Sequence, residues 1–216
     1  MADETTKVQG LVLRPARSED VATCVELCLL ANGSELKRFF GDLQRGVTLR
    51  DTMRVLCAAP DTEFSWRHFT LGEQDGQVIA GLCAVPTDDY PRLNKSLPYR
   101  LQQDAGIGSW GLTRLLFRGV IHKLLTPDAP KPPASLYMPV GAVLPTHRRK
   151  GIATQVLLHV IRNARNDRYL NLCLEVNRSN QAARALYVSL GFQPSALRGF
   201  GRKCLMTLRL HPPGQP

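Results

Sequence analysis

A basic turn between an apolar run and a helical stretch has the composition of an anion-binding site. It reads Val143-Leu144-Pro145-Thr146-His147-Arg148-Arg149-Lys150-Gly151-Ile152-Ala153-Thr154. The first turn of a helix leaves backbone N–H groups without partners, and residues as small as Gly151 and Ala153 let an anion approach them. A diphosphate fits this chemistry. A solvated basic turn before an ordinary helix fits the same residues taken alone.

Other ligand motifs do not match this turn. It has no Gly-x-Gly-x-x-Gly pattern for a dinucleotide, and Lys150 stands before Gly151, whereas a P-loop lysine follows its glycine. The six cysteines form no Cys-x-x-Cys pair, and most lie in apolar runs, as small buried residues do. Cys24 and Cys28 are one helical turn apart but have no histidine near them in sequence, so we expect no metal.

The net charge indicates an anionic partner. Lysine plus arginine number 28 and aspartate plus glutamate 18, a formal net charge of +10. Nucleic acid and a phosphorylated cofactor both suit this charge. The basic residues between His147 and Arg168 are not interleaved with aromatic residues, as a surface that binds single strands requires. We therefore favour the cofactor and keep nucleic acid as a distant alternative.

Hydrophobic periodicity and turn residues divide the chain into alternating strands and helices. Strands are expected at 11–14, 66–71, 78–85, 136–144, 170–176 and 205–210. Helices are expected at 18–30, with Ser18 as N-cap and Gly33 at the end, and at 34–43, 49–58, 109–125, 151–164 and 180–190. This order predicts an α/β sandwich around a central sheet, with ligands at the strand-to-helix junctions 143–153 and 176–181.

Length and composition indicate one domain. Residues 1–216 are 44% hydrophobic and 21% charged, as in an ordinary globular protein. We expect residues 88–133 to be a partly helical insertion and 211–216 a flexible tail. The polar residues 1–10 lack an apolar core of the secretory type, and no apolar run is long enough to span a bilayer. We expect a cytoplasmic monomer or homodimer with no membrane partner.

The run from Leu174 to Phe192 resembles the later half of the GNAT acetyltransferases. The family's order of Leu-Glu-Val, Ser-Asn, Ala, Leu-Tyr and Gly-Phe is all present at the right spacing. The turn is similar to the family's Arg/Gln-x-x-Gly-x-Gly/Ala acyl-CoA loop through Arg148, Gly151 and Ala153. The segments 13–20, 78–85 and 142–145 resemble its opening strand and helix start, its central hairpin strand and the strand end before the loop. Within the family, 174–187 is similar to ribosomal-protein N-terminal alanine acetyltransferases.

The resemblance implies an α/β fold of the GNAT type and an enzyme. The fold would have a central, mixed, mostly antiparallel sheet flanked by helices, with a helical insertion before the fourth strand. The co-substrate would be acetyl-CoA, and the reaction would move its acetyl group to a primary amine. The residues implied in cofactor binding are Gly141, Ala142, Val143, Arg148, Arg149, Lys150, Gly151, Ile152, Ala153, Thr154 and Asn180. Asn180 would bind the pantetheine arm, although Ser179 or Asn180 is also a suitable helix N-cap.

The same resemblance assigns the proton transfers. Tyr187 would be the general acid that protonates the CoA thiolate, and its phenol is protonated at pH 7; packing against the core is the alternative. Glu175 stands at the position of the general base in the N-terminal acetyltransferases, or else pairs with a nearby arginine. Other candidate bases, outside the resemblance, are His68, Asp88 and Asp89.

The acceptor is left open by the sequence. The insertion 88–133 could cover a small-molecule pocket and block a protein N-terminus, which favours a small-molecule amine, and the net charge disfavours a polycation. The alternatives are a protein N-terminal α-amine and a non-catalytic acyl-CoA-binding module. The aromatic residues of the insertion, Tyr90, Tyr99, Trp110 and Phe117, would line a pocket or form its own core.

Overall fold

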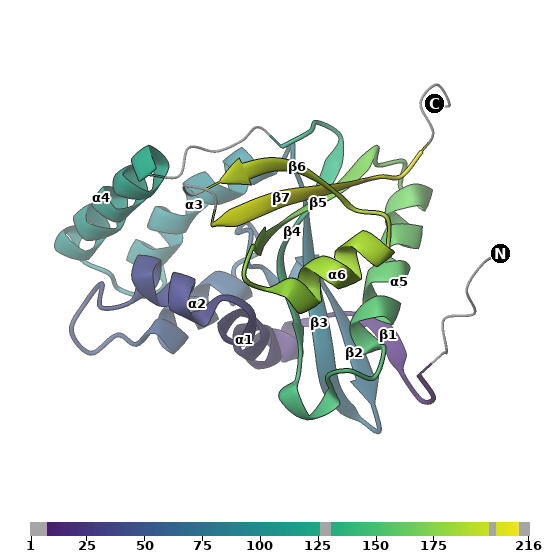
Figure 1. Cartoon of the computed structure of the whole chain (residues 1–216). Coiled ribbons are helices and arrows are strands. Elements are labelled where there is room, and N and C mark those ends of the chain that lie inside the picture. Colours follow the sequence, from purple (N-terminus) through teal and green to yellow (C-terminus); the bar gives the residue numbers. More distant parts are fainter. Residues whose placement is uncertain (1–7, 126–130, 199–201, 212–216) are drawn as a thin grey trace.

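The computed structural model describes residues 8–125, 131–198 and 202–211, and its centre is a seven-stranded sheet (Figure 1). The strands are β1 (Val12–Pro15), β2 (Phe69–Gln74), β3 (Gln77–Pro86), β4 (Ser135–Val143), β5 (Asn171–Asn177), β6 (Gln193–Arg198) and β7 (Lys203–Arg209). Their order is β1-β2-β3-β4-β5-β7-β6, and the pairs are antiparallel except for β4 with β5. The expected mixed, mostly antiparallel sheet is confirmed.

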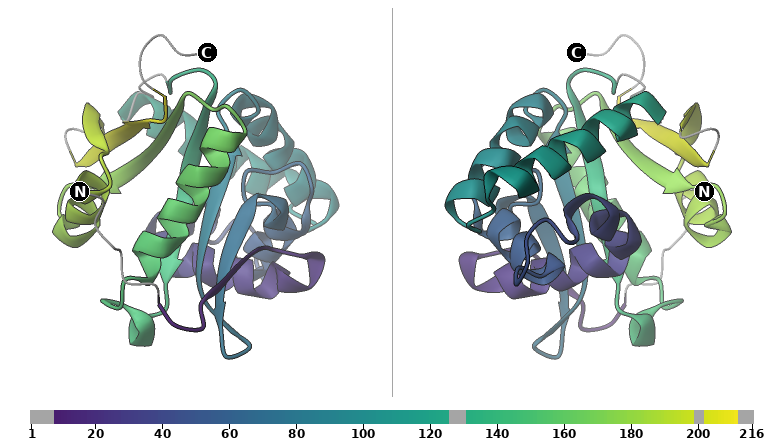
Figure 2. Two further views of the ribbon diagram at one scale, coloured as in Figure 1. Left: turned by 90° about the vertical axis from the view of Figure 1, so that its right-hand side faces the viewer. Right: turned by 90° about the vertical axis from the view of Figure 1, so that its left-hand side faces the viewer.

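Helices cover both faces of the sheet (Figure 2). They are α1 (Val21–Phe40), α2 (Leu49–Ala58), α3 (Tyr90–Gln103), α4 (Ser109–Leu125), α5 (Ile152–Asn166) and α6 (Gln181–Ser189), with short 3-10 turns η1 (Ser18–Asp20), η2 (Trp66–His68) and η3 (Pro145–His147). One face carries α5, and α1 to α4 gather on the other. The insertion before the fourth strand is helical, as expected. In the described part of the chain, no helix is both long and apolar enough to cross a membrane.

Each face of the sheet has its own apolar core. On the α5 face the helix buries Ile152, Val156 and Val160, which follow one another at four-residue spacing and so share a side of the helix. On the other face α1 packs against β3 at Gly81, where an added Cβ would come within 2.5 Å of Leu27 Cδ1. Glycine there lets the helix approach the centre of the sheet closely.

The strands β4 and β5 separate halfway along their length. Parallel pairing ends at Met138 and Leu174, although β4 continues to Val143 and β5 to Asn177. At the same point β4 has a bulge against β3, which bends the strand, and Pro139 in that bulge has no N–H to donate. Beyond the bulge, the facing edges of these two described strands no longer pair with each other, and we call the gap between them the opening in the sheet.

The helix α1 has a break in its helical geometry next to Gly33, where the sequence predicts one. It kinks at Asn32, where φ is −135° and ψ is 22°, and then resumes as far as Phe40. The Asn32 side-chain amide donates a hydrogen bond to the carbonyl oxygen of Pro139 at 2.9 Å. The kink therefore lies where α1 contacts the β4 bulge.

Asp20, and not Ser18, organises the start of α1. The Asp20 carboxylate accepts hydrogen bonds from the Arg14 guanidinium at 2.7 and 3.0 Å and from the backbone N–H of Arg17 at 2.7 Å. The bonds from Arg14 contribute most to holding the pKa of Asp20 below its usual value. The expected N-cap at Ser18 was wrong, because that residue lies inside the turn η1.

The sequence analysis did not predict α3 and β6, and it placed the start of β2 three residues too early. α3 contains Pro98 and begins with a proline in its first turn, which hides its helical pattern. β6 contains Pro194, a residue tolerated at the sheet edge where this strand lies. The strand expected at 66–71 starts at Phe69, after the turn η2. Apart from His211, the expected tail lies outside the described residues.

Candidate active site

The turn between β4 and α5 has a backbone suited to an anion. Arg149 and Gly151 have positive φ values of 65° and 78°, and Gly151 is the N-cap of α5. Left-handed residues in such a turn aim successive N–H groups to one side, and the unpaired N–H groups of the first helical turn add to them. The side chains of Arg148, Arg149 and Lys150 are exposed at the same helix start. Positive charge and free amides therefore coincide, as the sequence predicts.

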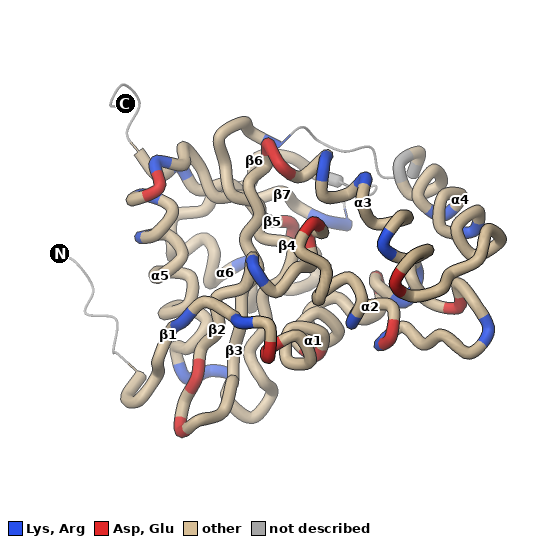
Figure 3. Tube along the Cα trace, turned by 180° about the vertical axis from the view of Figure 1, so that it is seen from behind, with Lys and Arg blue, Asp and Glu red and all other residues tan. Residues whose placement is uncertain are grey.

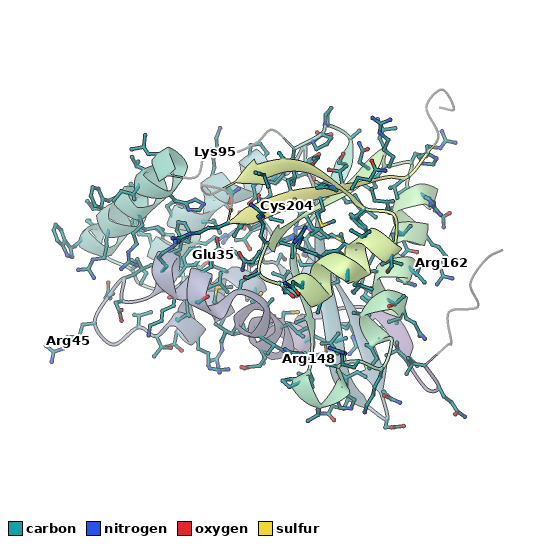
Figure 4. All side chains as sticks on the ribbon, viewed as in Figure 1. Glu35, Arg45, Lys95, Arg148, Arg162 and Cys204 are labelled. Carbon is teal, nitrogen blue, oxygen red and sulfur yellow. The ribbon has the colours of Figure 1, made fainter. Side chains whose placement is uncertain are left out.

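The last residues of β4 connect this turn to the opening in the sheet. Arg148 Nε donates a hydrogen bond to the carbonyl oxygen of Val143 at 3.1 Å, which ties the turn to the strand end (Figure 4). Gly141, Ala142 and Val143 pair with β3 along one edge and border the opening along the other. A Cβ built on Gly141 meets no atom within 4 Å, so the adjacent space is open. An extended molecule with amide groups can pair with such an edge.

Tyr187 lies in the core on the α5 face. Its ring is half-buried, and its centroid is 5.7 Å from that of Phe192. Burial raises the pKa of Tyr187 above its usual value of about 10. The phenol is therefore protonated at neutral pH, so packing against the core and donating a proton are compatible.

Glu175 points to the opposite face of the sheet. Its strand neighbours Leu174 and Val176 lie in the α5-side core, and alternation along a strand directs Glu175 towards α1. Its side chain is 14% exposed, and Oε2 lies 3.9 Å from Lys203 Nζ. The same ammonium lies 2.6 and 2.7 Å from the carboxylate oxygens of Glu35 on α1, which Figure 4 labels near the start of β7.

Asn180 is the N-cap of α6. Its side-chain oxygen accepts a hydrogen bond from the backbone N–H of Ala183 at 3.1 Å. The capping function that the sequence suggested for Ser179 or Asn180 thus belongs to Asn180. The cap uses the amide oxygen and not the amide N–H groups.

A cavity of about 1040 Å³ lies on the Glu175 side of the opening. Its wall comes from α1, α3, α4, the loop before η2, the middle of β4, the end of β5 and the start of β7, and we call it the interhelical cavity. Besides Glu175, the wall contains the carboxylates Glu35 and Glu63. The insertion helices α3 and α4 therefore help to enclose a space beside the candidate base.

The region that holds these features matches a known family. Residues 137–192 match the profile of the Acetyltransferase (GNAT) family, and they include most of β4, the basic turn, Glu175 and Tyr187. This match to the GNAT family covers the motif segment and not the whole chain. A segment of 57 residues is 42% identical to the [Ribosomal protein bS18]-alanine N-acetyltransferase of Salmonella typhimurium. That segment spans 26% of this chain and 38% of the relative's length.

Solved structures share the whole GNAT fold. An N-acetyltransferase from Staphylococcus aureus Mu50 has a TM-score of 0.70 at 17% identity, over 91% of this chain and 98% of that one. The PaiA N-acetyltransferase from Thermoplasma acidophilum, in complex with coenzyme A, has a TM-score of 0.52 at 12% identity, over 92% of this chain and 98% of that one. These similarities show the fold, including the region before β4.

Three other candidate bases lie away from the interhelical cavity. Asp88, Asp89 and His68 do not line the interhelical cavity among the described residues. Nε2 of His68 is buried with no hydrogen-bond partner in the described residues, and burial lowers the pKa of His68. Glu35 and Glu63, in contrast, reach the cavity from elements far from the motif, and no local pattern in the sequence marks them.

The aromatic residues of the insertion differ in their surroundings. Tyr90 lines the interhelical cavity, as one reading of the sequence expected. Tyr99, Trp110 and Phe117 are 58%, 74% and 64% exposed, so they form neither a pocket nor a core in the described structure. Elsewhere in the chain, the run 106–111 has the spacing Gly-x-Gly-x-x-Gly. It joins α3 to α4 and follows no strand, so it is not a dinucleotide-binding loop.

The cysteines of the chain are buried structural residues. All six are buried and free. Burial raises the pKa of the Cys24 thiol to about 12 and that of Cys173 to about 11, which keeps both unreactive. Among the described residues, histidine, cysteine and acidic side chains form no group of three or more suited to a metal.

Proposed function

We propose that this protein transfers the acetyl group of acetyl-CoA to the primary amine of a small molecule. The observation that carries the proposal is the opening between β4 and β5, which leads to the left-handed turn at Gly151. The opening presents a strand edge, and the turn presents amides and cations. An extended molecule with amide groups at one end and a diphosphate at the other matches both. Acetyl-CoA has these parts in that order.

In this proposal acetyl-CoA is held mainly by backbone groups. Its pantetheine amides pair with Gly141, Ala142 and Val143 at the edge of β4, and the amide N–H groups of Asn180 add a donor. The diphosphate lies at the start of α5, where the contacts are made by Arg148, Arg149, Lys150, Gly151, Ile152, Ala153 and Thr154. The fit is supported by the open space beside Gly141 and by the positive φ of Gly151.

Glu175 and Tyr187 are proposed to act from the two faces of the sheet. Glu175 takes a proton from the acceptor ammonium, directly or through water, because an alkylammonium is charged at neutral pH. The neutral amine attacks the thioester carbonyl, so that a C–N bond forms and the C–S bond breaks, and the nitrogen releases its surplus proton to solvent as the amide forms. The Tyr187 phenol gives its proton to the leaving thiolate and regains one from solvent. The raised pKa of Tyr187 supports its role as the acid.

A protein N-terminal α-amine is the second candidate acceptor. It is favoured by the 42% identity of the motif segment to the bS18-alanine N-acetyltransferase. It is disfavoured by α3 and α4, which enclose the cavity on the Glu175 side and leave less room for a folded partner. Peptides that begin with alanine distinguish the two candidates.

The test is release of CoA thiol from acetyl-CoA with a panel of amines and N-terminal peptides. Glu175→Gln should lower kcat/KM by about 100-fold, a typical contribution of a general base, and leave acetyl-CoA binding unchanged. Glu19→Gln, at a carboxylate that is 68% exposed on η1, is the control and should have no effect. Binding of acetyl-CoA with no thiol release from any amine or peptide would instead indicate a non-catalytic acyl-CoA-binding module.

A further inference from the structure

The wall of the interhelical cavity is mainly apolar. Its inner part consists of core side chains such as Leu36, Phe40 and Phe64, which are 5%, 7% and 7% exposed. On the α4 side the wall continues over Leu116 and Val120, which are 59% and 57% exposed. Exposed apolar side chains that adjoin an apolar cavity are typical of a surface that contacts a ligand.

Among the described residues, the charged groups in the wall do not form an acidic surface. The carboxylates are Glu35, Glu63 and Glu175, and the cations are Arg38, Lys131, Arg202 and Lys203. Lys203 binds Glu35 directly. Figure 3 likewise shows acidic and basic segments interspersed around α1 and α3. A polycationic acceptor needs an excess of carboxylates, which this wall does not provide.

The rings of Tyr90 and Tyr137 in the cavity wall make cation–π contacts with Lys131. Lys131 Nζ lies 4.1 Å from the ring centroid of Tyr90 and 4.3 Å from that of Tyr137. The two rings are 5.3 Å apart in an edge-to-face arrangement. Since Lys131 takes the cation–π position, a second positive charge on an acceptor gains little there.

We propose that the acceptor is a primary amine on a bulky apolar body, such as an arylalkylamine or a long-chain alkylamine. This inference rests on the proposed acetyltransferase function. The amine would lie at Glu175, and the apolar body would fill the interhelical cavity against α1 and α4. A cavity of about 1040 Å³ is far larger than a short alkylamine needs, whereas apolar ligands of drug size fill spaces of several hundred Å³.

Gly119 of α4 allows the cavity to be narrowed without disturbing the fold. It lines the cavity, and a Cβ built on it meets no atom within 4 Å. Gly119→Leu therefore places an apolar side chain in the cavity and also improves helix propensity. Thr113→Leu is the matched control, because Thr113 is an exposed residue of the same helix that is not part of the cavity wall.

The experiment compares kcat/KM for 2-phenylethylamine, octylamine, ethylamine, spermidine and an alanine-initial hexapeptide in a thiol-release assay. The wild-type protein should prefer the two apolar amines to ethylamine and spermidine by about tenfold or more. Gly119→Leu should lower kcat/KM for 2-phenylethylamine by about tenfold and leave the value for ethylamine within about twofold. Thr113→Leu should change neither value.

Three results would overturn the inference. Preference for spermidine or for the peptide would show a different acceptor class. An equal loss for all amines in Gly119→Leu would show that α4 does not contact the apolar body. Absence of thiol release from every probe, with acetyl-CoA still bound, would refute the proposed function itself, and the inference would fall with it.

Discussion

The ammonium of Lys203 lies 2.6 and 2.7 Å from the two carboxylate oxygens of Glu35, which joins the start of β7 to α1. The same ammonium is 3.9 Å from Oε2 of Glu175. The proposed base thus lies near a cation that another carboxylate holds more closely. A carboxylate is a weaker proton acceptor when a cation binds it directly. We infer that Glu35 keeps Lys203 from weakening Glu175 as a base.

Glu35→Gln should therefore impair catalysis without removing a group that contacts the acetyl donor. Lys203 would move towards Glu175, and a close cation favours the charged form of a carboxylate, which makes it a weaker proton acceptor. We expect kcat/KM at pH 7 to fall by about tenfold, with acetyl-CoA affinity unchanged by calorimetry. The double variant Glu35→Gln/Lys203→Met removes the cation as well and should recover most of the activity. A double variant as slow as Glu35→Gln would contradict this relationship.

Tyr187→Phe should lower kcat by at least about tenfold while the Kd for acetyl-CoA changes by less than about twofold, since only the proton donor is lost. Burial raises the pKa of Tyr187, so the acid form persists through neutral pH, and the wild-type rate should not fall through loss of this proton below about pH 10. Tyr99→Phe, at an exposed tyrosine, is the control. Equal rates for Tyr187→Phe and wild type would remove Tyr187 from the acid role.

Gly151→Ala should weaken acetyl-CoA binding. Gly151 has a φ of 78°, and a side chain in the left-handed region costs about 1 to 2 kcal/mol, so the turn would deform and Kd should rise by about fivefold or more. Gly46→Ala is matched to it, because Gly46 has a φ of 83° with open space around its Cβ position. It should lose similar stability in urea and bind acetyl-CoA normally. Equal Kd values for the two variants would argue against a diphosphate at the turn.

Substitutions of Asn180 can separate its capping of α6 from its proposed contact with acetyl-CoA. Asn180→Asp keeps an oxygen that can accept from the Ala183 N–H and suits a helix start, so the free energy of unfolding should be unchanged or higher. It loses the amide N–H donors, so acetyl-CoA should bind more weakly. Asn180→Ala should lose both binding and about 1 kcal/mol of stability. Normal acetyl-CoA affinity in Asn180→Asp would leave only the capping role.

The sequence was a good guide where local chemistry decides the structure. α2 and α4 have the bounds that apolar periodicity predicts, and the strands that flank the two motifs are where alternation and turn residues place them. The turn before α5 was predictable because Pro145 ends the apolar run of the strand and helical periodicity begins at Gly151. α3 and β6 were missed because proline obscures their patterns, whereas Gly33 indicated the interruption of α1 to within one residue, at Asn32.

The surroundings of Glu175 could not be predicted from the sequence. Lys203 and Glu35 are separated by 168 positions in the chain, and only the pairing of β5 with β7 and the packing of α1 bring them together. The interhelical cavity depends in the same way on how α3 and α4 pack. Motif residues indicate the chemistry at the acetyl donor, whereas the space for the acceptor depends on tertiary packing.

Hydrogen exchange with and without acetyl-CoA is the most direct test of the central claim, that the β4–β5 opening and the start of α5 hold the cofactor. Saturating acetyl-CoA should slow exchange of the backbone amides of residues 140–143 and 149–154, since these groups gain hydrogen-bond partners. Amides in the turn between β2 and β3 should not change. Unchanged exchange in both segments at saturation, or protection confined to other parts of the chain, would contradict the account.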